Sequence, residues 1–192
     1  FAAHQQLKEQ IKAMEKKFES AGAQRIVYYS TAWLSVLGVS VQGRAQLKGT
    51  HVDENWHDLG DLKFDFKVDR KFAESLTERL KSNKYAASLI DFEGFPVDSQ
   101  TIVADQLLNH RQLPVSMISS HVYADHQTTI KHGEIVSQAI AQDQVPTAVV
   151  ALSHLSCSFF GKTLDWQDDH VSEPAEDQHN KMLLDHLTAK RV

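Results

Sequence analysis

The stretch Arg25-Ile-Val-Tyr-Tyr-Ser-Thr-Ala-Trp33 decides the fold. Its first half, residues 26–29, is an unbroken run of β-branched and aromatic side chains, which is typical of a strand buried on both faces. The small residues Ser30, Thr31 and Ala32 follow, and we expect them to open a loop at the carboxyl end of this strand. Ligands bind at the carboxyl ends of strands in open α/β sheets. The stretch therefore predicts a central strand and the position of a functional site.

The rest of the chain alternates between helical and extended patterns. Amphipathic helices are predicted at residues 1–20, 69–82, 99–110, 128–142 and 176–187, and strands at residues 62–66, 86–92, 113–120 and 146–152. This alternation predicts an α/β fold with a mostly parallel central sheet flanked by helices. Residues 32–41 fit a short helix ending near Gly38 and then a strand, although the pattern does not decide between helix and strand there.

Three burial patterns follow from the spacing of apolar residues. Helix 1–20 carries one apolar stripe, which predicts that it covers a sheet through Leu7, Ile11, Met14 and Phe18. Helix 99–110 is expected to bury Ile102, Val103, Leu107 and Leu108. The apolar run at 146–152 predicts a buried strand of the parallel type.

Composition limits the classes of function. A length of 192 residues with 42% apolar residues predicts one α/β domain over residues 1–192. The formal net charge of −5 argues against a nucleic-acid partner, because phosphate binding favours a basic surface. Cys157 is the only cysteine, which excludes an intrachain disulfide and suggests a reducing, cytoplasmic compartment. No apolar run approaches the ~20 residues of a membrane-spanning helix, so no membrane partner is expected.

Polar residues near predicted strands are candidates for chemistry. His51, Asp53 and His57 precede the strand at 62–66. Imidazole and carboxylate groups suit zinc or ferrous iron. The spacing of these residues matches no compact ligand motif, and a polar loop that lines a cleft or an interface is the preferred interpretation. His121 follows the strand at 113–120, and His154 follows the strand at 146–152.

Four segments carry a resemblance to a known family. They are Val27-Tyr-Tyr-Ser-Thr-Ala-Trp33, His51-Val-Asp-Glu-Asn-Trp56, Gly94-Phe-Pro-Val-Asp98 and Ala148-Val-Val-Ala-Leu-Ser-His-Leu-Ser156. In this order, and over nearly the whole chain, they resemble the class III extradiol ring-cleavage dioxygenases, and within that family its non-catalytic subunits. The second segment is the most specific of the four.

The resemblance implies a definite set of site residues. Active members of the family bind one ferrous ion through two histidines and a glutamate and use a further histidine as acid–base catalyst. The strand that carries the first iron histidine has no counterpart here, and we expect the domain to lack it. Ala32, or Thr31 if the register slips by one residue, occupies the second position. The carboxylate falls at Glu176 or Asp177, and these are the residual metal-ligand candidates.

Two further positions follow from the same resemblance. His121, or less favourably His126, lies in the region of the acid–base histidine. His154 lies where active members often carry a histidine near the substrate. The catalytic candidates are therefore His121 and His154, and the candidates for the substrate cleft are Thr31, Ala32, Trp33, His51, Asp53 and Tyr123.

Three hypotheses about function remain open from the sequence. The first is a catalytically silent dioxygenase-like subunit that holds no cofactor and assembles with itself or with an iron-bearing homologue. The second is an active non-haem Fe(II) dioxygenase that cleaves a catechol or aminophenol ring. The third is an aromatic-ligand binding protein whose pocket is lined by Trp33, Trp56 and Tyr123.

Overall fold

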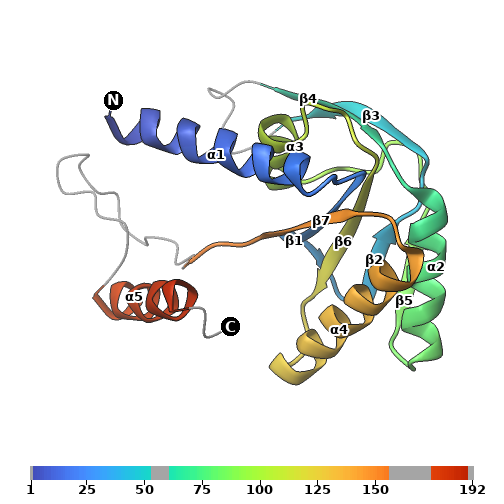
Figure 1. Ribbon diagram of the computed structural model, residues 1–192. Coiled ribbons are helices and arrows are strands. Elements are labelled where there is room, and N and C mark those ends of the chain that lie inside the picture. The colour runs from blue at the N-terminus through green and yellow to red at the C-terminus, as the bar shows by residue number, and fades with distance from the viewer. Residues whose placement is uncertain (1, 53–60, 156–173, 190–192) are drawn as a thin grey trace. The chain divides into compact units, whose positions relative to one another are not determined.

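The computed structural model describes residues 2–52, 61–155 and 174–189. The chain divides into two compact units, residues 1–152 and residues 153–192. The first unit holds the β-strands and four helices of the described chain, and the second holds the helix α5 (Pro174–Thr188) (Figure 1). The sequence prediction of one domain over residues 1–192 stays a prediction.

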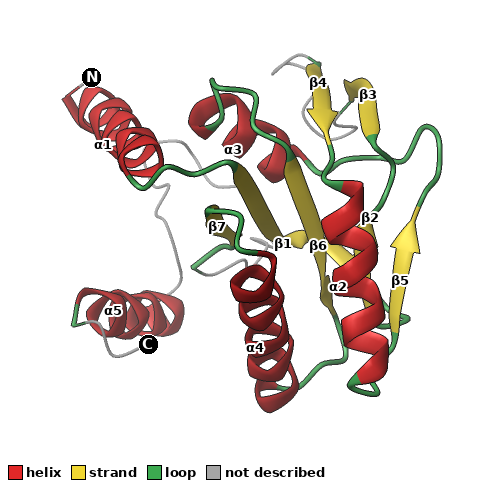
Figure 2. Ribbon diagram, turned by 45° about the vertical axis from the view of Figure 1, so that its right-hand side comes forward, coloured by secondary structure: helices red, strands yellow, loops and turns green. Residues whose placement is uncertain are grey.

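A five-stranded sheet organises the first unit, in the order β5-β2-β6-β1-β7. Its strands are β1 (Arg25–Ser35), β2 (Val39–Gln42), β5 (Ala87–Ile90), β6 (Val115–His121) and β7 (Thr147–Leu152). β1 is parallel to β6 and β7, and β2 is parallel to β5, while β2 and β6 meet in an antiparallel pair. The predicted α/β class with a mostly parallel sheet flanked by helices is therefore confirmed. Figure 2 shows these strands in yellow among the helices.

β1 is the central strand that the sequence predicted, but it is longer than predicted. Ile26, Val27 and Tyr28 are fully buried. The expected loop at residues 30–32 is wrong, because β1 continues to Ser35. Of the helix and the strand that the pattern left open from residue 32, the structure has the strand, as far as Ser35. The ladder with β6 is interrupted instead: Ser30 pairs with Ser119, and Leu34 pairs with the next residue, Ser120. Local patterns missed this irregularity, since it arises from pairing with a distant strand.

Alternate residues of β1 point to opposite faces of the sheet, as the strand period of two requires. Ile26 and Tyr28 belong to one core cluster, and Val27 belongs to the other. The helix α3 (Ser99–Leu108) and the hairpin of β3 (Gln46–His51) and β4 (Leu62–Lys67) lie on the first face. The helices α2 (Arg70–Ser82) and α4 (His126–Asp143) pack together on the second face (Figure 2).

The helix starts follow the capping rules. Asp69, Asp98 and Asp125 precede α2, α3 and α4, and each carboxylate accepts a hydrogen bond from a backbone N–H group in the first turn. The predicted helices at 69–82, 99–110 and 128–142 are confirmed within two residues at each end. Among the residues that the structure describes, no helix combines the length and apolar character needed to cross a membrane.

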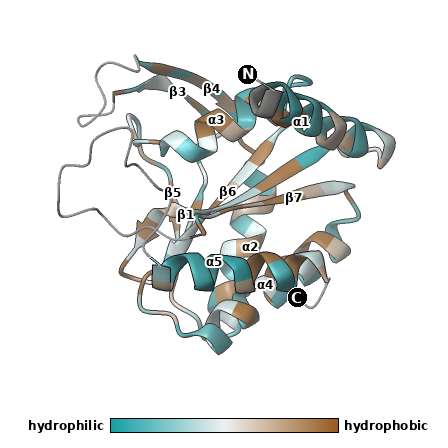
Figure 3. Ribbon diagram, turned by 90° about the vertical axis from the view of Figure 1, so that its left-hand side faces the viewer, coloured by the Kyte–Doolittle hydropathy of each residue, from teal (hydrophilic) through white to brown (hydrophobic). Residues whose placement is uncertain are grey.

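The predicted hairpin strand at 62–66 is confirmed as β4. Residues of β4 alternate between half-buried or buried and exposed positions, and Figure 3 shows the matching alternation of hydropathy. β4 pairs antiparallel with β3 over six residue pairs. The hairpin places Leu47 and Phe66 in the core and leaves its charged side chains in solvent.

Three burial predictions are wrong, and each depends on strand order or helix placement. β7 is an edge strand, and Val149 on one of its faces is exposed. Val103 and Leu107 of α3 are exposed, and only Ile102 of the predicted set is fully buried. The helix α1 (Ala2–Ser20) makes its main contacts with α3 rather than with the sheet, so Leu7 and Met14 remain exposed.

Candidate functional site

The interrupted part of β1 forms the centre of the candidate site. The pairing between β1 and β6 skips three residues of β1, which lie between the paired residues Ser30 and Leu34. These three, Thr31, Ala32 and Trp33, have no ladder partner on β6. The hydroxyl of Thr31 donates to the backbone carbonyl of Leu152 at 3.2 Å, and the N–H of Ala32 donates to the hydroxyl of Ser30 at 3.2 Å. A bulge of this kind redirects side chains near a sheet edge. Here it turns Trp33 toward the core face that also holds Tyr28.

Two contacts join this bulge to the turn at residues 93–98. The ring of Trp33 meets the ring of Phe95 edge to face, with centroids 5.2 Å apart. The hydroxyl of Ser30 donates to Asp98 at 3.0 Å, and the same carboxylate caps α3 by accepting from the N–H of Thr101 at 2.9 Å. The structure therefore brings together two of the sequence segments that carried the family resemblance, 27–33 and 94–98.

A third segment joins them through a pocket. The β3–β4 hairpin and the turn at 93–97 line an open pocket of about 580 Å³. His51, at the end of β3, lines it together with Phe64 and Phe95. The role of His51 in a substrate cleft stays a prediction, and Asp53, His57 and Trp56 lie outside the described residues.

Polar side chains at the carboxyl end of β6 form a separate group. His121 is the last residue of β6 and pairs with Ser35 of β1. Tyr123 meets His121 edge to face at 6.4 Å but is 78% exposed. The pKa of His132 in α4 is lowered by burial first and by the charge of His121 second. Neither His121 nor Tyr123 lines the pocket beside His51.

The remaining candidates belong to the second unit. His154 is exposed in the segment after β7, and Glu176 and Asp177 lie in the first turn of α5. Asp177 forms an ion pair with Lys181 at 2.5 Å. These three residues are described within their own unit, and their roles toward Ala32 stay predictions.

The three residues of the bulge, Thr31, Ala32 and Trp33, carry no imidazole or carboxylate group. A ferrous ion in this chemistry needs imidazole and carboxylate donors. The side chain of Ala32 is a methyl group without a lone pair, and the hydroxyl of Thr31 is engaged with Leu152. Across residues 2–52, 61–155 and 174–189, no group of three or more His, Cys, Asp or Glu side chains is placed to hold a metal ion.

A buried polar pair lies beneath the site on the same face of the sheet. The phenol of Tyr28 donates to Asp105 of α3 at 3.2 Å, and the amide of Asn109 donates to the same oxygen at 2.8 Å. Burial raises the pKa of Tyr28, and Asp105 raises it further. Burial also raises the pKa of Asp105, although the two hydrogen bonds oppose this shift. The pair ties β1 to α3 and so supports the bulge from below.

Sequence reasoning missed Phe95, Asp98 and Arg44 as site residues. Phe95 and Asp98 stood in a quoted segment but carried no role, because their partners are more than 60 positions away. Arg44 follows β2 and lines the pocket beside His51. The available signal for Arg44 is its position just after β2, and for Asp98 its position directly before α3, whereas Phe95 lies in the turn between β5 and α3 and carried no such signal.

Comparisons with known proteins extend this picture. The chain is 32% identical over 171 residues to the 2-aminophenol 1,6-dioxygenase alpha subunit of a Pseudomonas species, and the match covers 88% of this chain. The chain is similar to a dioxygenase subunit. It spans 63% of the length of that relative. No family model matches the sequence.

A solved structure supports the fold alone. An uncharacterized protein from Escherichia coli K12 superposes with a TM-score of 0.66 at 17% sequence identity, over 93% of this chain and 65% of that one. Both comparisons therefore match this chain to part of a longer protein. The relative's name agrees with the motif resemblance, and the fold match agrees with the mixed α/β sheet.

Proposed function

We propose that this chain is a subunit of the class III extradiol dioxygenase type that is catalytically silent on its own and assembles with an iron-bearing homologous subunit. The observation that carries the proposal is the 32% identity with a dioxygenase alpha subunit, combined with Ala32 at the centre of the bulge. The sequence resemblance assigns an iron histidine to that position. An alanine there offers no metal donor, and within the described part of the chain no group of three or more His, Cys, Asp or Glu side chains is placed to hold a metal ion.

The packing around the bulge supports a structural role for the segment. Thr31, Ser30 and Trp33 are each engaged by hydrogen bonds or ring contacts to β7, Asp98 and Phe95. These contacts support a bulge that is held by packing and hydrogen bonds rather than by a metal ion. Metal affinity depends on the number and geometry of donors. A single remaining carboxylate at Glu176 or Asp177 would bind iron weakly.

An exposed apolar surface supports the proposed assembly. At the carboxyl ends of β1 and β6, apolar side chains point into solvent, and we call them the edge patch: Leu34, Val36, Leu37, Val122 and Tyr123. Leu37 is 82% exposed. The two strands are joined there, because the N–H of Val122 donates to the carbonyl of Ser35 at 3.0 Å. Contiguous exposed apolar residues mark protein interfaces, and the relative is named as a subunit. We propose that the edge patch of this chain binds the iron-bearing homologue.

Iron and oxygen measurements test catalytic silence. The full-length protein is purified without chelator, its iron is quantified by mass spectrometry, and oxygen uptake is followed with catechol and 2-aminophenol. We expect substoichiometric iron and no uptake by the chain alone. Stoichiometric iron with turnover would establish an active dioxygenase and refute the silent subunit.

Light scattering with a matched pair of variants tests the assembly. Leu37→Asp in the edge patch is expected to weaken association with the co-expressed homologous subunit. Leu7→Asp places the same charge at an exposed apolar position of α1 and is expected to leave association unchanged. If the two substitutions weakened association equally, the edge patch would not be part of the interface.

A further inference from the structure

We infer that an open pocket between β4 and the C-terminal half of α3, the α3 pocket, binds a compact aliphatic ammonium ion. The inference concerns non-covalent binding and does not depend on the proposed subunit role. Val115, the first residue of β6, lines this pocket, whereas the bulge of β1 lies beside residues 119–120 at the other end of β6. The α3 pocket is therefore separate from the bulge and its contacts.

The α3 pocket consists of two adjoining parts of about 180 and 280 Å³. Its apolar walls belong to the core, since Phe66, Ile102 and Val115 are at most 2% exposed. Five residues line both parts: Asp65, Phe66, Asp105, Asn109 and Gln112. Both volumes lie below the range of about 300–1,000 Å³ that is usual for drug-sized ligands. The pocket therefore suits a short alkyl chain with one polar group.

Asp105 has one carboxylate oxygen left for a ligand. Its Oδ1 accepts from the phenol of Tyr28 at 3.2 Å and from the amide of Asn109 at 2.8 Å. Its Oδ2 accepts no hydrogen bond from residues 2–52, 61–155 or 174–189. The side chain is half-buried, and burial raises the pKa of this carboxyl because its charge is poorly solvated. A cation at Oδ2 would stabilise the charge that the protein leaves without a counter-ion.

Two amides in the pocket are oriented so that they add acceptors. The NH₂ group of Gln46 donates to Asp65, and the NH₂ group of Gln106 donates to the carbonyl of Lys63 at 3.0 Å. The Oε1 atoms of both glutamines accept from no residue that the structure describes. Together with Oδ2 of Asp105, these oxygens favour a ligand with several N–H donors. A primary ammonium group has three such donors and no acceptor.

Two lysines also line the pocket, but they lie at its outer rim. Lys63 and Lys67 alternate with Phe64 and Phe66 along β4, and they are exposed where the phenylalanines face the core. Water and salt screen exposed charges, whereas a half-buried carboxylate interacts more strongly with a nearby charge. The charge of Asp105 therefore decides which ligand binds in the inner part of the pocket.

The matched probes are n-butylammonium and n-butanol, which share an alkyl chain and differ in charge. Binding is measured by calorimetry on the full chain at neutral pH, where an alkylamine is protonated. We expect saturable binding of butylammonium, with affinity that falls as salt is raised, and binding of butanol weaker by about tenfold or more. Equal affinity for the two probes, or no saturation with butylammonium, would overturn the inference.

Two substitutions of the same kind locate the site. Asp105→Asn removes the charge and keeps an oxygen that can accept from Tyr28 and Asn109, and we expect it to weaken butylammonium binding by about tenfold or more. Glu134→Gln removes an exposed carboxylate from α4, on the opposite face of the sheet, and is expected to leave the affinity unchanged. If folded Asp105→Asn binds butylammonium as tightly as the unaltered chain does, the site is refuted.

Backbone amide NMR locates the ligand without any substitution, which keeps the test decisive if Asp105→Asn does not fold. Titration of the unaltered, ¹⁵N-labelled chain with butylammonium should shift the signals of residues 63–67 and 102–112. The signals of α4 should stay in place. Saturable shifts that avoid residues 102–112 would mean that butylammonium binds elsewhere, and they would refute the α3 pocket.

Discussion

The ring of Trp33 meets the ring of Phe95 edge to face at 5.2 Å, which joins the interrupted part of β1 to the turn before α3. Edge-to-face pairs contribute about 0.5–1.5 kcal/mol beyond the burial of their area. We therefore expect Trp33→Leu and Phe95→Leu to show a coupling energy of about that size in a double-mutant cycle measured by urea unfolding.

The control cycle pairs Trp33→Leu with Phe72→Leu. Phe72 belongs to the core cluster on the opposite face of the sheet, so the two effects should add. Coupling as large between Trp33 and Phe72 as between Trp33 and Phe95 would contradict a direct ring contact.

A second prediction concerns Arg25, a buried cation at the start of β1. Arg25 is 1% exposed and donates to Asp69 at 2.9 Å, to Asp143 at 2.6 Å and to Thr147 at 2.9 Å. Its guanidinium also lies 3.8 Å above the ring of Phe72. Arg25→Met would leave two carboxylates close together without a cation. We expect a loss of about 2–4 kcal/mol in the free energy of unfolding, measured by urea denaturation.

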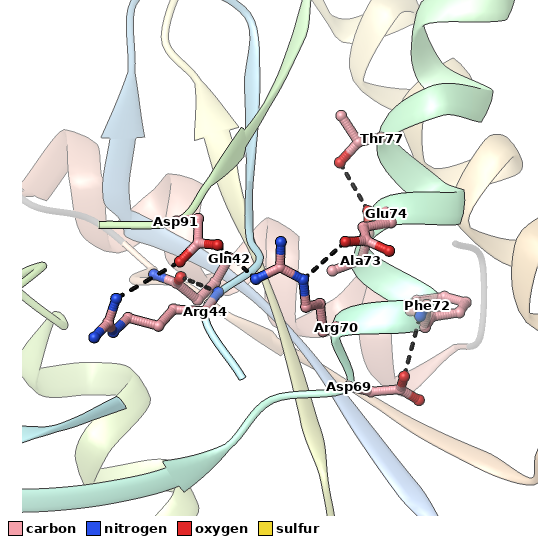
Figure 4. A network of polar contacts seen from close by, with 9 residues as sticks. All are labelled: Gln42, Arg44, Asp69, Arg70, Phe72, Ala73, Glu74, Thr77 and Asp91. Carbon is pink, nitrogen blue, oxygen red and sulfur yellow. Dashed lines mark hydrogen bonds and ion pairs between the residues drawn. The ribbon is translucent and has the colours of Figure 1, made fainter. Parts of the chain in front are cut away.

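Arg70 provides the matched control, because it also joins two carboxylates. It pairs with Glu74 at 2.8 Å and with Asp91 at 2.5 Å, as Figure 4 shows, but it is 44% exposed. Ion pairs at the surface contribute little to stability. Arg70→Met should therefore change the free energy of unfolding far less than Arg25→Met. Similar losses for both would show that burial does not decide the strength of these networks.

The sequence predicted the individual helices and strands well, but it predicted their arrangement in space poorly. Runs of apolar residues located β1 and β7, and the alternation of Leu62, Phe64 and Phe66 located β4, because each pattern reports the environment of its own segment. The exposure of Val149 follows from the place of β7 at the sheet edge, which no local pattern encodes. The same holds for the site: Trp33 and Phe95 are 62 positions apart, and their contact exists only once β1 and α3 share a face.

A third prediction concerns the dependence of stability on pH through Asp105. Burial raises the pKa of this carboxyl in the folded protein. Folding therefore favours the protonated form, and the folded state binds more protons between the unfolded and folded pKa values. Stability from this group is present below its unfolded pKa, near 4, and is lost as the pH rises through the raised folded pKa.

Asp105→Asn tests this sign. An asparagine Oδ1 can accept both hydrogen bonds, from Tyr28 and from Asn109, which reach the same oxygen of Asp105. In the unaltered chain, Asp105 lowers the stability as the pH rises. We expect the Asp105→Asn variant to lack this decrease. Urea unfolding between pH 4 and pH 7 measures the difference between the two. A difference in stability that is independent of pH would show that Asp105 titrates alike in the folded and unfolded states.

The last prediction compares two glycines, one at which a side chain would clash with the backbone and one at which it would not. Gly38 joins β1 to β2 with φ of +106°, and a Cβ atom there would lie 2.2 Å from the carbonyl oxygen of Ala86. Gly133 lies within α4, where a Cβ atom would meet nothing within 4 Å. Gly38→Ala should destabilise the fold by at least about 2 kcal/mol, since it adds strain and a backbone clash. Gly133→Ala should stabilise it by about 0.5–1 kcal/mol, because alanine favours helix. Thermal unfolding of both variants measures the two signs, and a neutral Gly38→Ala would mean that the turn between β1 and β2 adopts another conformation in solution.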